Sequence, residues 1–258
     1  MSHPASWLVP RWTSPAVGAL MTTREGGESE GAFASMNVGA SVGDAPDRVA
    51  ANRRRFAAAC AAEPVFLRQV HGRRVVRLGA ADADPGAAMH EADASYTTEP
   101  GIACAVQVAD CLPVLLAAPS ARAVGAVHAG WRGLAAGVVE AAVAAVCDAA
   151  ACAPAELEAW LGPCIGRRRF EVGADVLEAF AGGPGAIDAG AFRPLRSGKW
   201  LADLPALART RLAAAGVLGS DGAASCTVED ASRFFSFRRD GVTGRMVAAV
   251  WIRGAAAR

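Results

Sequence analysis

The 258-residue sequence lacks several features that would place it in a broad class at once. No apolar stretch approaches the ~18 residues of a membrane-spanning helix, so we expect no membrane span. The N-terminus has no basic segment followed by an apolar run, and we therefore expect no signal peptide. The seven cysteines are odd in number and form no CxxC pair, which argues against a disulfide framework. These absences together predict a cytoplasmic protein with reduced thiols.

An excess of charge of one sign is also missing. Lysine and arginine total 26 and aspartate and glutamate total 25, which leaves a formal net charge of +1. This balance gives no basis for a general attraction to nucleic acid or to an anionic membrane. Lys199 is the only lysine, and GC-rich coding explains this preference for arginine. No internal repeat, linker or change in composition divides the chain, so we expect a single domain over residues 1–258.

Apolar periodicity predicts intermixed helices and strands. Residues 47–62, 134–150 and 200–215 show the spacing of amphipathic helices. Residues 66–78 contain two apolar runs on either side of His71-Gly72, which predicts a hairpin. A second hairpin is expected to turn at Asp240-Gly241, and residues 246–252 read as the last strand.

The segment between residues 104 and 133 contains the most informative residues. Cys111 ends the apolar run AVQVADC, and His128 ends the run AVGAVH. We interpret the segment as two buried strands whose polar ends are adjacent. The turn AGWRG then leads into a helix, and a helix N-terminus favours an anion. Trp131 could stack on a ring and Arg132 could pair with phosphate, whereas a tight turn with a packed tryptophan explains the same residues.

Histidine is scarce, with His3, His71, His90 and His128 making up the whole set. His71 and His128 each follow an apolar run, as Cys111 does, and two imidazoles with one thiolate suit a zinc ion that keeps an open position. Alternatively, Cys111 is a nucleophile activated by His128, with Asp110 orienting the pair. Hydrogen-bonded structural histidines and a buried structural cysteine are the simplest explanation of all.

Three motifs carry a resemblance to a known family. QVHG (69–72), ADCLPVLL (109–116) and HAGWRG (128–133) occur in this order, and the chain resembles the YfiH-type family, whose members have been called laccase-domain proteins, multicopper polyphenol oxidases and peptidoglycan editing factors. The similarity extends over nearly the whole chain, through MTTREGG, SMNVG, NRRRF, LGPCIG and RFFSFRRDG. Two departures are NVG for the commoner NLG and FSF for FSY, which leaves no hydroxyl at Phe237.

The resemblance implies a fold and a set of site residues. The fold is α+β, with stacked mixed β-sheets flanked by helices in α/β/β/α layers, similar to the cysteine hydrolases of the deamidating cytotoxic-factor type. The implied metal ligands are His71, Cys111 and His128, with Zn²⁺ as the metal. The implied substrate-binding residues are Asn37, Arg53 and Arg24.

The resemblance also implies a zinc-dependent purine nucleoside enzyme. Members phosphorolyse adenosine, inosine and methylthioadenosine, and they deaminate adenosine. Zinc lowers the pKa of a bound water to about 7, which suits deamination. We expect Arg53 and Arg24 to hold phosphate, and Asp110 is the nearest candidate for a proton shuttle. A purine nucleoside and phosphate are therefore the expected partners, and the sequence leaves the oligomeric state open.

Three alternatives remain at this stage. A copper-dependent polyphenol oxidase of the multicopper type needs more ligands than four histidines supply, although copper(II) would compete with zinc for the same His–Cys–His site. A Cys–His hydrolase or peptidoglycan-precursor editing factor would survive chelation and lose activity when Cys111 is alkylated. A binding protein with structural zinc would unfold when the metal is removed.

Overall fold

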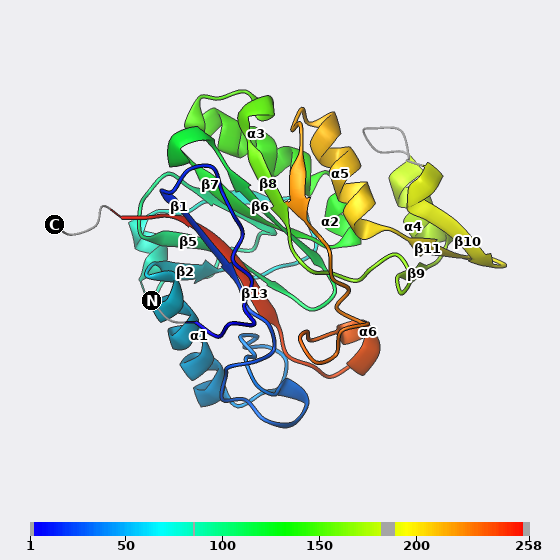
Figure 1. The fold of residues 1–258 in the computed structure, drawn as a ribbon, viewed down its shortest axis with the longest axis horizontal. Coiled ribbons are helices and arrows are strands. Elements are labelled where there is room, and N and C mark those ends of the chain that lie inside the picture. Colours follow the sequence, from blue (N-terminus) through cyan, green and yellow to red (C-terminus); the bar gives the residue numbers. More distant parts are fainter. Residues whose placement is uncertain (1–2, 85, 182–188, 255–258) are drawn as a thin grey trace.

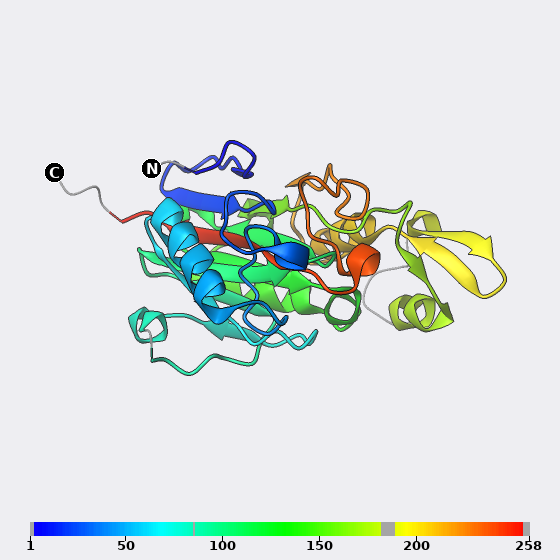
Figure 2. The same cartoon turned by 90° about the horizontal axis from the view of Figure 1, so that it is seen from below.

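Two β-sheets stacked face to face form the centre of the computed structural model, which describes residues 3–84, 86–181 and 189–254 (Figures 1 and 2). The four-stranded sheet has the order β1 (Val17–Met21), β13 (Met246–Ile252), β5 (Ile102–Val108), β2 (Glu63–Phe66). The six-stranded sheet has the order β12 (Ser220–Gly222), β8 (Glu158–Leu161), β6 (Leu112–Ala117), β7 (Val124–Ala129), β4 (Ala94–Thr97), β3 (Val75–Arg77).

The central strands are apolar along their whole length because both of their faces are covered. Every residue of β6, β7 and β13 is buried. One core lies between the two sheets and combines residues such as Cys104 and Ala248 of one sheet with Leu115 and Ala126 of the other. A strand buried on both faces loses the alternation of polar and apolar residues, which is why these segments read as continuous apolar runs.

Helices cover the outer faces of both sheets (Figures 1 and 2). Helix α1 (Pro46–Cys60) packs Phe56 and Cys60 against the four-stranded sheet, and it begins with a proline at its first position. Helices α3 (Val138–Ala150) and α5 (Leu204–Ala214) form a core with the six-stranded sheet. The predicted α+β fold with α/β/β/α layers is therefore confirmed.

Shorter elements complete the chain. A three-stranded sheet with the order β10 (Phe192–Arg196), β11 (Lys199–Ala202), β9 (Glu171–Val172) lies beside α4 (Ala174–Ala181), at the far end of the molecule from α1 (Figure 1). Two short helices, α2 (Trp131–Ala135) and α6 (Phe237–Asp240), lie in connections. The 3₁₀ turns are Gly31–Phe33, Ala80–Ala83, Pro119–Ala121, Pro154–Glu156 and Ala189–Ala191. Among the described residues, no helix has both the length and the apolar character needed to cross a membrane.

The hairpin predicted over residues 66–78 is wrong. Strand β2 pairs in parallel with β5 in the four-stranded sheet, whereas β3 pairs in parallel with β4 in the six-stranded sheet. The segment between them crosses from one sheet to the other, and His71 lies in this crossing. Two apolar runs around a glycine look the same in the sequence whether they pair with each other or with separate partners.

Three other predicted elements differ in detail. The helix expected over 134–150 is divided, because Gly137 has a positive φ of 92° between α2 and α3. The helix expected over 200–215 begins only at Leu204, where the Asp203 carboxylate accepts a hydrogen bond from the Ala206 N–H. The hairpin expected around Asp240-Gly241 is instead the helix α6, capped by Ser236.

Candidate metal site

Three separate segments bring His71, Cys111 and His128 together. Cys111 occupies the turn between β5 and β6, and His128 lies near the end of β7. The antiparallel pairing of β6 with β7 sets Pro113 opposite His128, so the start of one strand meets the end of the other. The crossing segment between the sheets supplies His71. The thiol and the imidazole are thus adjacent because β6 pairs with β7. The sequence pattern predicts two strands in this segment, whereas the structure has three, β5, β6 and β7.

The ligand atoms of this cluster converge. One atom from each of His71, Cys111 and His128 lies within 4.8 Å of the others, and the Cys111 Sγ is 3.6 Å from His71 Nε2. A tetrahedral zinc ion with usual bond lengths separates its ligand atoms by about 3.5 Å. His128 is buried, Cys111 is half-buried and His71 is exposed, so the cluster opens to solvent on one side. The donor set and its open side fit a metal ion that retains a free position.

Two glycines of the HAGWRG motif allow this convergence. A Cβ atom on Gly130 would lie 2.7 Å from His71 Cδ2 and 3.1 Å from Cys111 Sγ. A Cβ atom on Gly133 would lie 2.7 Å from the Gly72 carbonyl oxygen. The helix N-terminus that carries these glycines therefore approaches the His71 segment more closely than any side chain would permit.

A buried carboxylate orients both histidines. Asp93 is fully buried, and its Oδ1 accepts hydrogen bonds from His128 Nδ1 and from the His71 backbone N–H, both at 2.8 Å. Its Oδ2 accepts from the N–H groups of Gly72 at 2.7 Å and Val70 at 3.2 Å. Because a carboxylate only accepts, the Nδ1 of His128 carries the proton and its Nε2 is left for the cluster.

Burial and charge oppose each other in this cluster. Burial of the Cys111 thiol acts to raise its pKa, but the charge of His128 and hydrogen bonds from both histidines outweigh burial and lower the pKa from 9.0 to about 6. Burial acts to lower the pKa of His128, but the Cys111 thiolate and the Asp93 carboxylate raise it from 6.5 to about 9. At neutral pH, the metal-free pair is therefore a thiolate beside an imidazolium.

These pKa values predict the protons that a metal displaces. A metal takes the Cys111 thiolate directly but requires neutral His128, so we expect release of one proton between pH about 6 and 9. Below about pH 6 Cys111 is also protonated and more than one proton leaves, whereas above about pH 9 His128 is already neutral and this pair releases none. Affinity for zinc should therefore rise with pH up to about 9. Calorimetry at pH 7.5 in buffers with different heats of ionisation measures this number, and zero released protons would contradict the ion pair.

The sequence suggested that Asp110 orients Cys111 and His128, and the structure places its carboxylate against other partners. Its carboxylate accepts hydrogen bonds of 2.6 Å from the Thr227 hydroxyl and from the Arg238 backbone N–H. Asp93 is the carboxylate that contacts His128. Asp110 has a positive φ of 89°, and His71 has one of 60°. Such backbone conformations are uncommon for residues other than glycine and cluster at functional sites. The role of Asp110 as a proton shuttle stays a prediction.

Asn37 and Arg24, both expected near the substrate, contribute their polar groups to the scaffold. The Asn37 amide oxygen accepts from the backbone N–H groups of Gly39 and Arg245, each at 2.8 Å, and its amide nitrogen donates to Asp44. Arg24 donates to the carbonyl oxygens of Ala34 and Ala231. Asn37 thereby fixes the backbone of Arg245. Direct contact of Asn37 or Arg24 with substrate stays a prediction.

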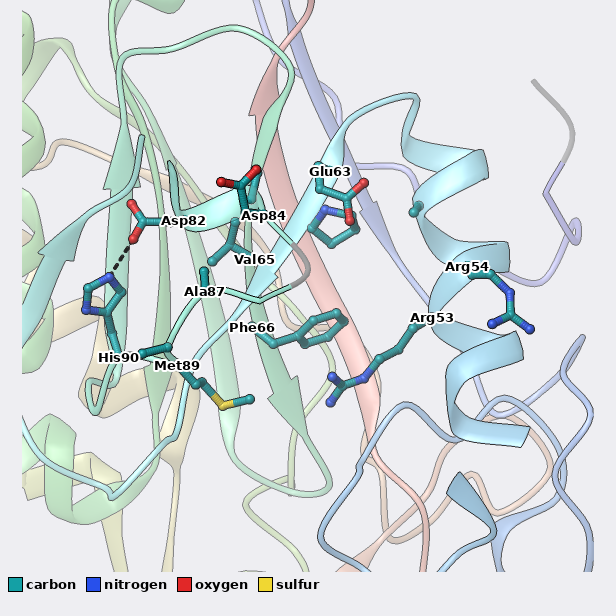
Figure 3. Close-up of a pocket in the computed structure, with 14 residues that line it drawn as sticks. Arg53, Arg54, Glu63, Val65, Phe66, Asp82, Asp84, Ala87, Met89 and His90 are labelled. Atoms are coloured by element: carbon teal, nitrogen blue, oxygen red, sulfur yellow. Dashed lines mark hydrogen bonds and ion pairs between the residues drawn. The ribbon is translucent and has the colours of Figure 1, made fainter. Parts of the chain in front are cut away.

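Arg53 lies in a separate cavity of about 380 Å³ (Figure 3). Its Nε donates to the Val38 carbonyl oxygen at 2.9 Å, and its guanidinium carbon is 4.1 Å from the centroid of the Phe66 ring. Figure 3 shows the side chain extending from α1 toward Phe66 and Met89. Among the described residues, the lining of this cavity includes none of the three cluster residues. Contact between Arg53 and phosphate stays a prediction.

The remaining motif residues have structural partners. Trp131 is partly buried against the core beside the six-stranded sheet, and the Arg132 guanidinium lies 4.4 Å from its ring centroid. This packing favours the interpretation of GWRG as a tight turn. The His90 Nε2 lies 2.7 Å from the Asp82 Oδ1, and this pair includes none of the three cluster residues.

Sequence reasoning missed Asp93 and Arg245. Arg245 is close enough to the cluster for the charges of Cys111 and Asp110 to act on it, although burial dominates and lowers the pKa of its guanidinium. It donates to the carbonyl oxygens of Thr243 and Gly244, lies 5.8 Å from the Phe237 ring centroid, and forms no ion pair among the described residues. Nothing in the local sequence distinguishes it from the many other arginines.

Comparisons with known proteins match nearly the whole chain. The family described as multi-copper polyphenol oxidoreductase laccase matches residues 18–253. A purine nucleoside phosphorylase of Pseudomonas aeruginosa is 45% identical over 249 residues, covering 96% of this chain and 99% of that protein. YfiH of Escherichia coli, also named a purine nucleoside phosphorylase, is 46% identical over 250 residues, covering 95% of this chain and 98% of that protein.

Solved structures show the same fold. A Neisseria meningitidis protein superposes with a TM-score of 0.89 at 45% identity and covers 96% of this chain and 100% of its own. YlmD of Geobacillus stearothermophilus also superposes with a TM-score of 0.89, at 34% identity, and covers 98% of each chain.

Proposed function

Since this chain belongs to the multi-copper polyphenol oxidoreductase laccase family, the YfiH-type family that its motifs resemble, we propose that it is a zinc-dependent purine nucleoside phosphorylase. The observation that carries this proposal is the convergence of His71, Cys111 and His128 with one side open. Two relatives at 45% and 46% identity bear the name of this activity. Purine nucleoside and phosphate are then the substrates.

The chain supplies positioned groups around the proposed zinc ion. Zinc bound there would act as a Lewis acid and activate water or a substrate oxygen. Asp93 holds the His128 ring with Nε2 toward the cluster. The Arg245 guanidinium, which forms no ion pair among the described residues, is near enough for the charge of Cys111 to act on it. An arginine fork suits phosphate, so we assign Arg245 to the phosphate. Phe237, 58% exposed next to Arg245, offers its ring to the base.

Adenosine deamination and the choice of metal are finer parts of the proposal. The open side of the cluster suits a zinc deaminase as well as a phosphorylase. Among the residues that the structure describes, this cluster is the one group of three or more histidine, cysteine or carboxylate ligands, which supports one metal ion rather than a copper cluster. Copper(II) binds such donors more tightly than zinc and would compete for the site. Residence in the cytoplasm, where nucleosides are found, stays a prediction from the number and spacing of the cysteines.

The proposal is tested by metal content and turnover together. The purified protein should contain about one zinc per chain and convert inosine to hypoxanthine only when phosphate is present. Chelation should abolish turnover, and added zinc should restore it while circular dichroism shows that the fold persists. A folded, zinc-loaded protein that leaves adenosine, inosine and methylthioadenosine unchanged in phosphate would overturn the proposal.

An Arg245→Ala variant tests the assignment of phosphate. Loss of a charge-assisted contact should raise the KM for phosphate about tenfold, because such hydrogen bonds contribute about 1.5–3 kcal/mol. The KM for the nucleoside should change little. Arg253→Ala is the matched control, since Arg253 also lies over an aromatic ring, that of Trp251, at 5.9 Å. Equal phosphate KM values in both variants would remove Arg245 from the site.

One observation favours a second candidate, a cysteine hydrolase. Cys111, His128 and Asp93 form a thiol–imidazole–carboxylate series in which the thiol pKa is lowered to about 6. An enzyme of this class could hydrolyse an amide bond in a peptidoglycan precursor and so act as an editing factor. Amide hydrolysis that persists under chelation and stops on alkylation of Cys111 would support the hydrolase, and the opposite pattern supports the zinc enzyme.

A further inference from the structure

Two cysteines outside the metal site, Cys164 and Cys226, lie on neighbouring extended segments. They form a parallel β-bridge, and the Thr227 N–H donates to the Cys164 carbonyl oxygen at 2.9 Å. Both are free thiols. These segments follow β8 and β12, which are themselves parallel neighbours in the six-stranded sheet. The backbone register of that sheet therefore places the two residues directly beside each other.

The backbone spacing suits a disulfide between these residues. Neighbouring strands lie about 4.7–4.9 Å apart, and disulfides span Cα separations of about 4.4–6.8 Å. Side chains of residues in register project to the same face of a sheet, so rotation about χ1 together with a small approach of the two segments brings the sulfurs together. Gly166 leaves room for this, because a Cβ atom there would lie 3.1 Å from the Cys226 Cβ and 3.3 Å from its Sγ.

The pair is also accessible to a small oxidant. Cys164 and Cys226 both line a cavity of about 270 Å³ whose lining also includes Arg168 and Arg209. Cys226 is half-buried, whereas Cys164 is only 1% exposed. The Gly166 N–H donates to the Cys226 Sγ at 3.2 Å, which fixes this sulfur in the lining of the cavity. Cys226 is therefore the thiol that meets a reactant first.

We propose that Cys226 and Cys164 are an oxidisable pair that closes to a disulfide when a hydroperoxide enters this cavity. Cys226 Sγ attacks one peroxide oxygen, the O–O bond breaks, and Cys226 becomes a sulfenic acid as one water (or alcohol) leaves. Cys164 Sγ then attacks the Cys226 sulfur, and its proton leaves with the hydroxyl group as a second water. Two thiols lose two electrons, and the peroxide gains them. Burial raises the pKa of Cys164 well above its ordinary value, so Cys164 is not the thiol that attacks the peroxide first.

The disulfide would act on the metal site through Asp110. The residue after Cys226 is Thr227, whose hydroxyl donates to the Asp110 carboxylate at 2.6 Å. The residue after Cys164 is Ile165, whose N–H donates to the Asp110 carbonyl oxygen at 2.9 Å. Drawing the two cysteines together displaces both donors, and Asp110 immediately precedes Cys111. Oxidation should therefore weaken metal binding severalfold.

The test uses the full chain with Cys147 and Cys152 replaced by serine, because these two thiols also lie within hydrogen-bonding reach of each other. The protein is loaded with zinc to shield Cys111, treated with hydrogen peroxide, and digested without reduction. We expect a linked pair of peptides that contains residues 164 and 226 and is lighter by two hydrogens than the separate peptides. A phosphine reductant should separate them and restore zinc affinity.

A Cys226→Ser variant on the same background separates this inference from the proposed function. It should show neither the linked peptides nor the reversible loss of zinc affinity, while untreated zinc binding stays at the parent level. The linked peptides are detected whether or not the protein turns over nucleosides. The inference is overturned if Cys226 is recovered as free thiol or sulfinic acid, if Cys164 links to another cysteine, or if zinc affinity is unchanged in the linked protein.

Discussion

A Gly130→Ala variant should bind zinc at least about 100-fold more weakly than the wild type, because we expect it to lose one of the zinc ligands. The free energy of zinc binding at structural sites is roughly 10–16 kcal/mol for four ligands, or about 2.5–4 kcal/mol for each ligand. The new methyl carbon would lie 2.7 Å from His71 Cδ2 and 3.1 Å from Cys111 Sγ. Gly130 follows β7, a central strand buried along its length, so its backbone cannot move away. The exposed His71 ring is the group that can turn, and turning removes it from the cluster.

The backbone at Gly130 isolates this steric effect. Its φ of −65° and ψ of 155° suit any residue, so alanine brings no backbone strain. The metal-free variant should therefore unfold at nearly the wild-type temperature while its zinc affinity falls. Gly219→Ala is the control, since a Cβ there meets nothing within 4 Å. Competition with a chromophoric chelator gives both affinities, and a Gly130→Ala protein that binds zinc as the wild type does would show that His71 is not a ligand.

Several strands and helices were predictable because burial leaves a strong apolar pattern, whereas their α/β/β/α layering was implied by the family resemblance. The segment 246–252 is apolar throughout and forms β13, and residues 47–62 show the helical spacing of α1. The crossing at 66–78 was not predictable, because a strand's partner is not encoded in its own residues. Val65 pairs with Cys104 and Val75 with Ala94, and either run would have served as a hairpin arm. The extent of the single domain stays a prediction.

The three cluster residues could be named from their chemistry and from the family resemblance, but the carboxylate that supports them could not. Asp110 precedes Cys111 in the chain, and this adjacency made it the apparent partner. The antiparallel pairing of β4 with β7 sets Ala94 opposite Val127. Asp93, which precedes Ala94, therefore lies opposite His128, which follows Val127. The His128 N–H accordingly donates to the Asp93 carbonyl oxygen at 2.7 Å. Only the sheet register reveals that Asp93 is the neighbour of His128.

Arg245 was missed for a related reason. Its position depends on a contact between residues 208 apart in the sequence, in which its backbone N–H donates to the Asn37 amide oxygen. The family resemblance pointed to Asn37, and the structure shows that this side chain holds another residue in place. A motif can thus mark a supporting residue, while the group that we propose to contact phosphate, Arg245, lies elsewhere in the chain.

An Asp93→Asn variant should lose about 10–100-fold in zinc affinity, the usual cost of removing the hydrogen-bond partner of a metal-binding histidine. The amide keeps the shape of the carboxylate but replaces one acceptor oxygen with a donor NH₂ group. If its oxygen stays toward His128 Nδ1, its NH₂ faces the N–H groups of Gly72 and Val70. If the amide is flipped, its NH₂ faces His128 and the His71 N–H. Either orientation leaves two donors facing an NH₂ group in place of an acceptor.

The same substitution should lower the stability of the metal-free protein, because an N–H group that loses its acceptor beside the fully buried Asp93 side chain costs up to about 1–3 kcal/mol. This effect separates Asp93 from a residue that touches only the metal, because loss of such a residue would leave the stability of the metal-free protein unchanged.

Asp82→Asn is the matched control, because Asp82 also pairs with a histidine, His90, at 2.7 Å, but both side chains are partly exposed. Chemical unfolding without metal, followed by zinc titration, measures the two effects on one sample. We expect both to appear in Asp93→Asn and neither in Asp82→Asn, because a solvated pair contributes little to stability. Wild-type zinc affinity in a destabilised Asp93→Asn protein would show that the carboxylate supports the fold at this point without orienting His128.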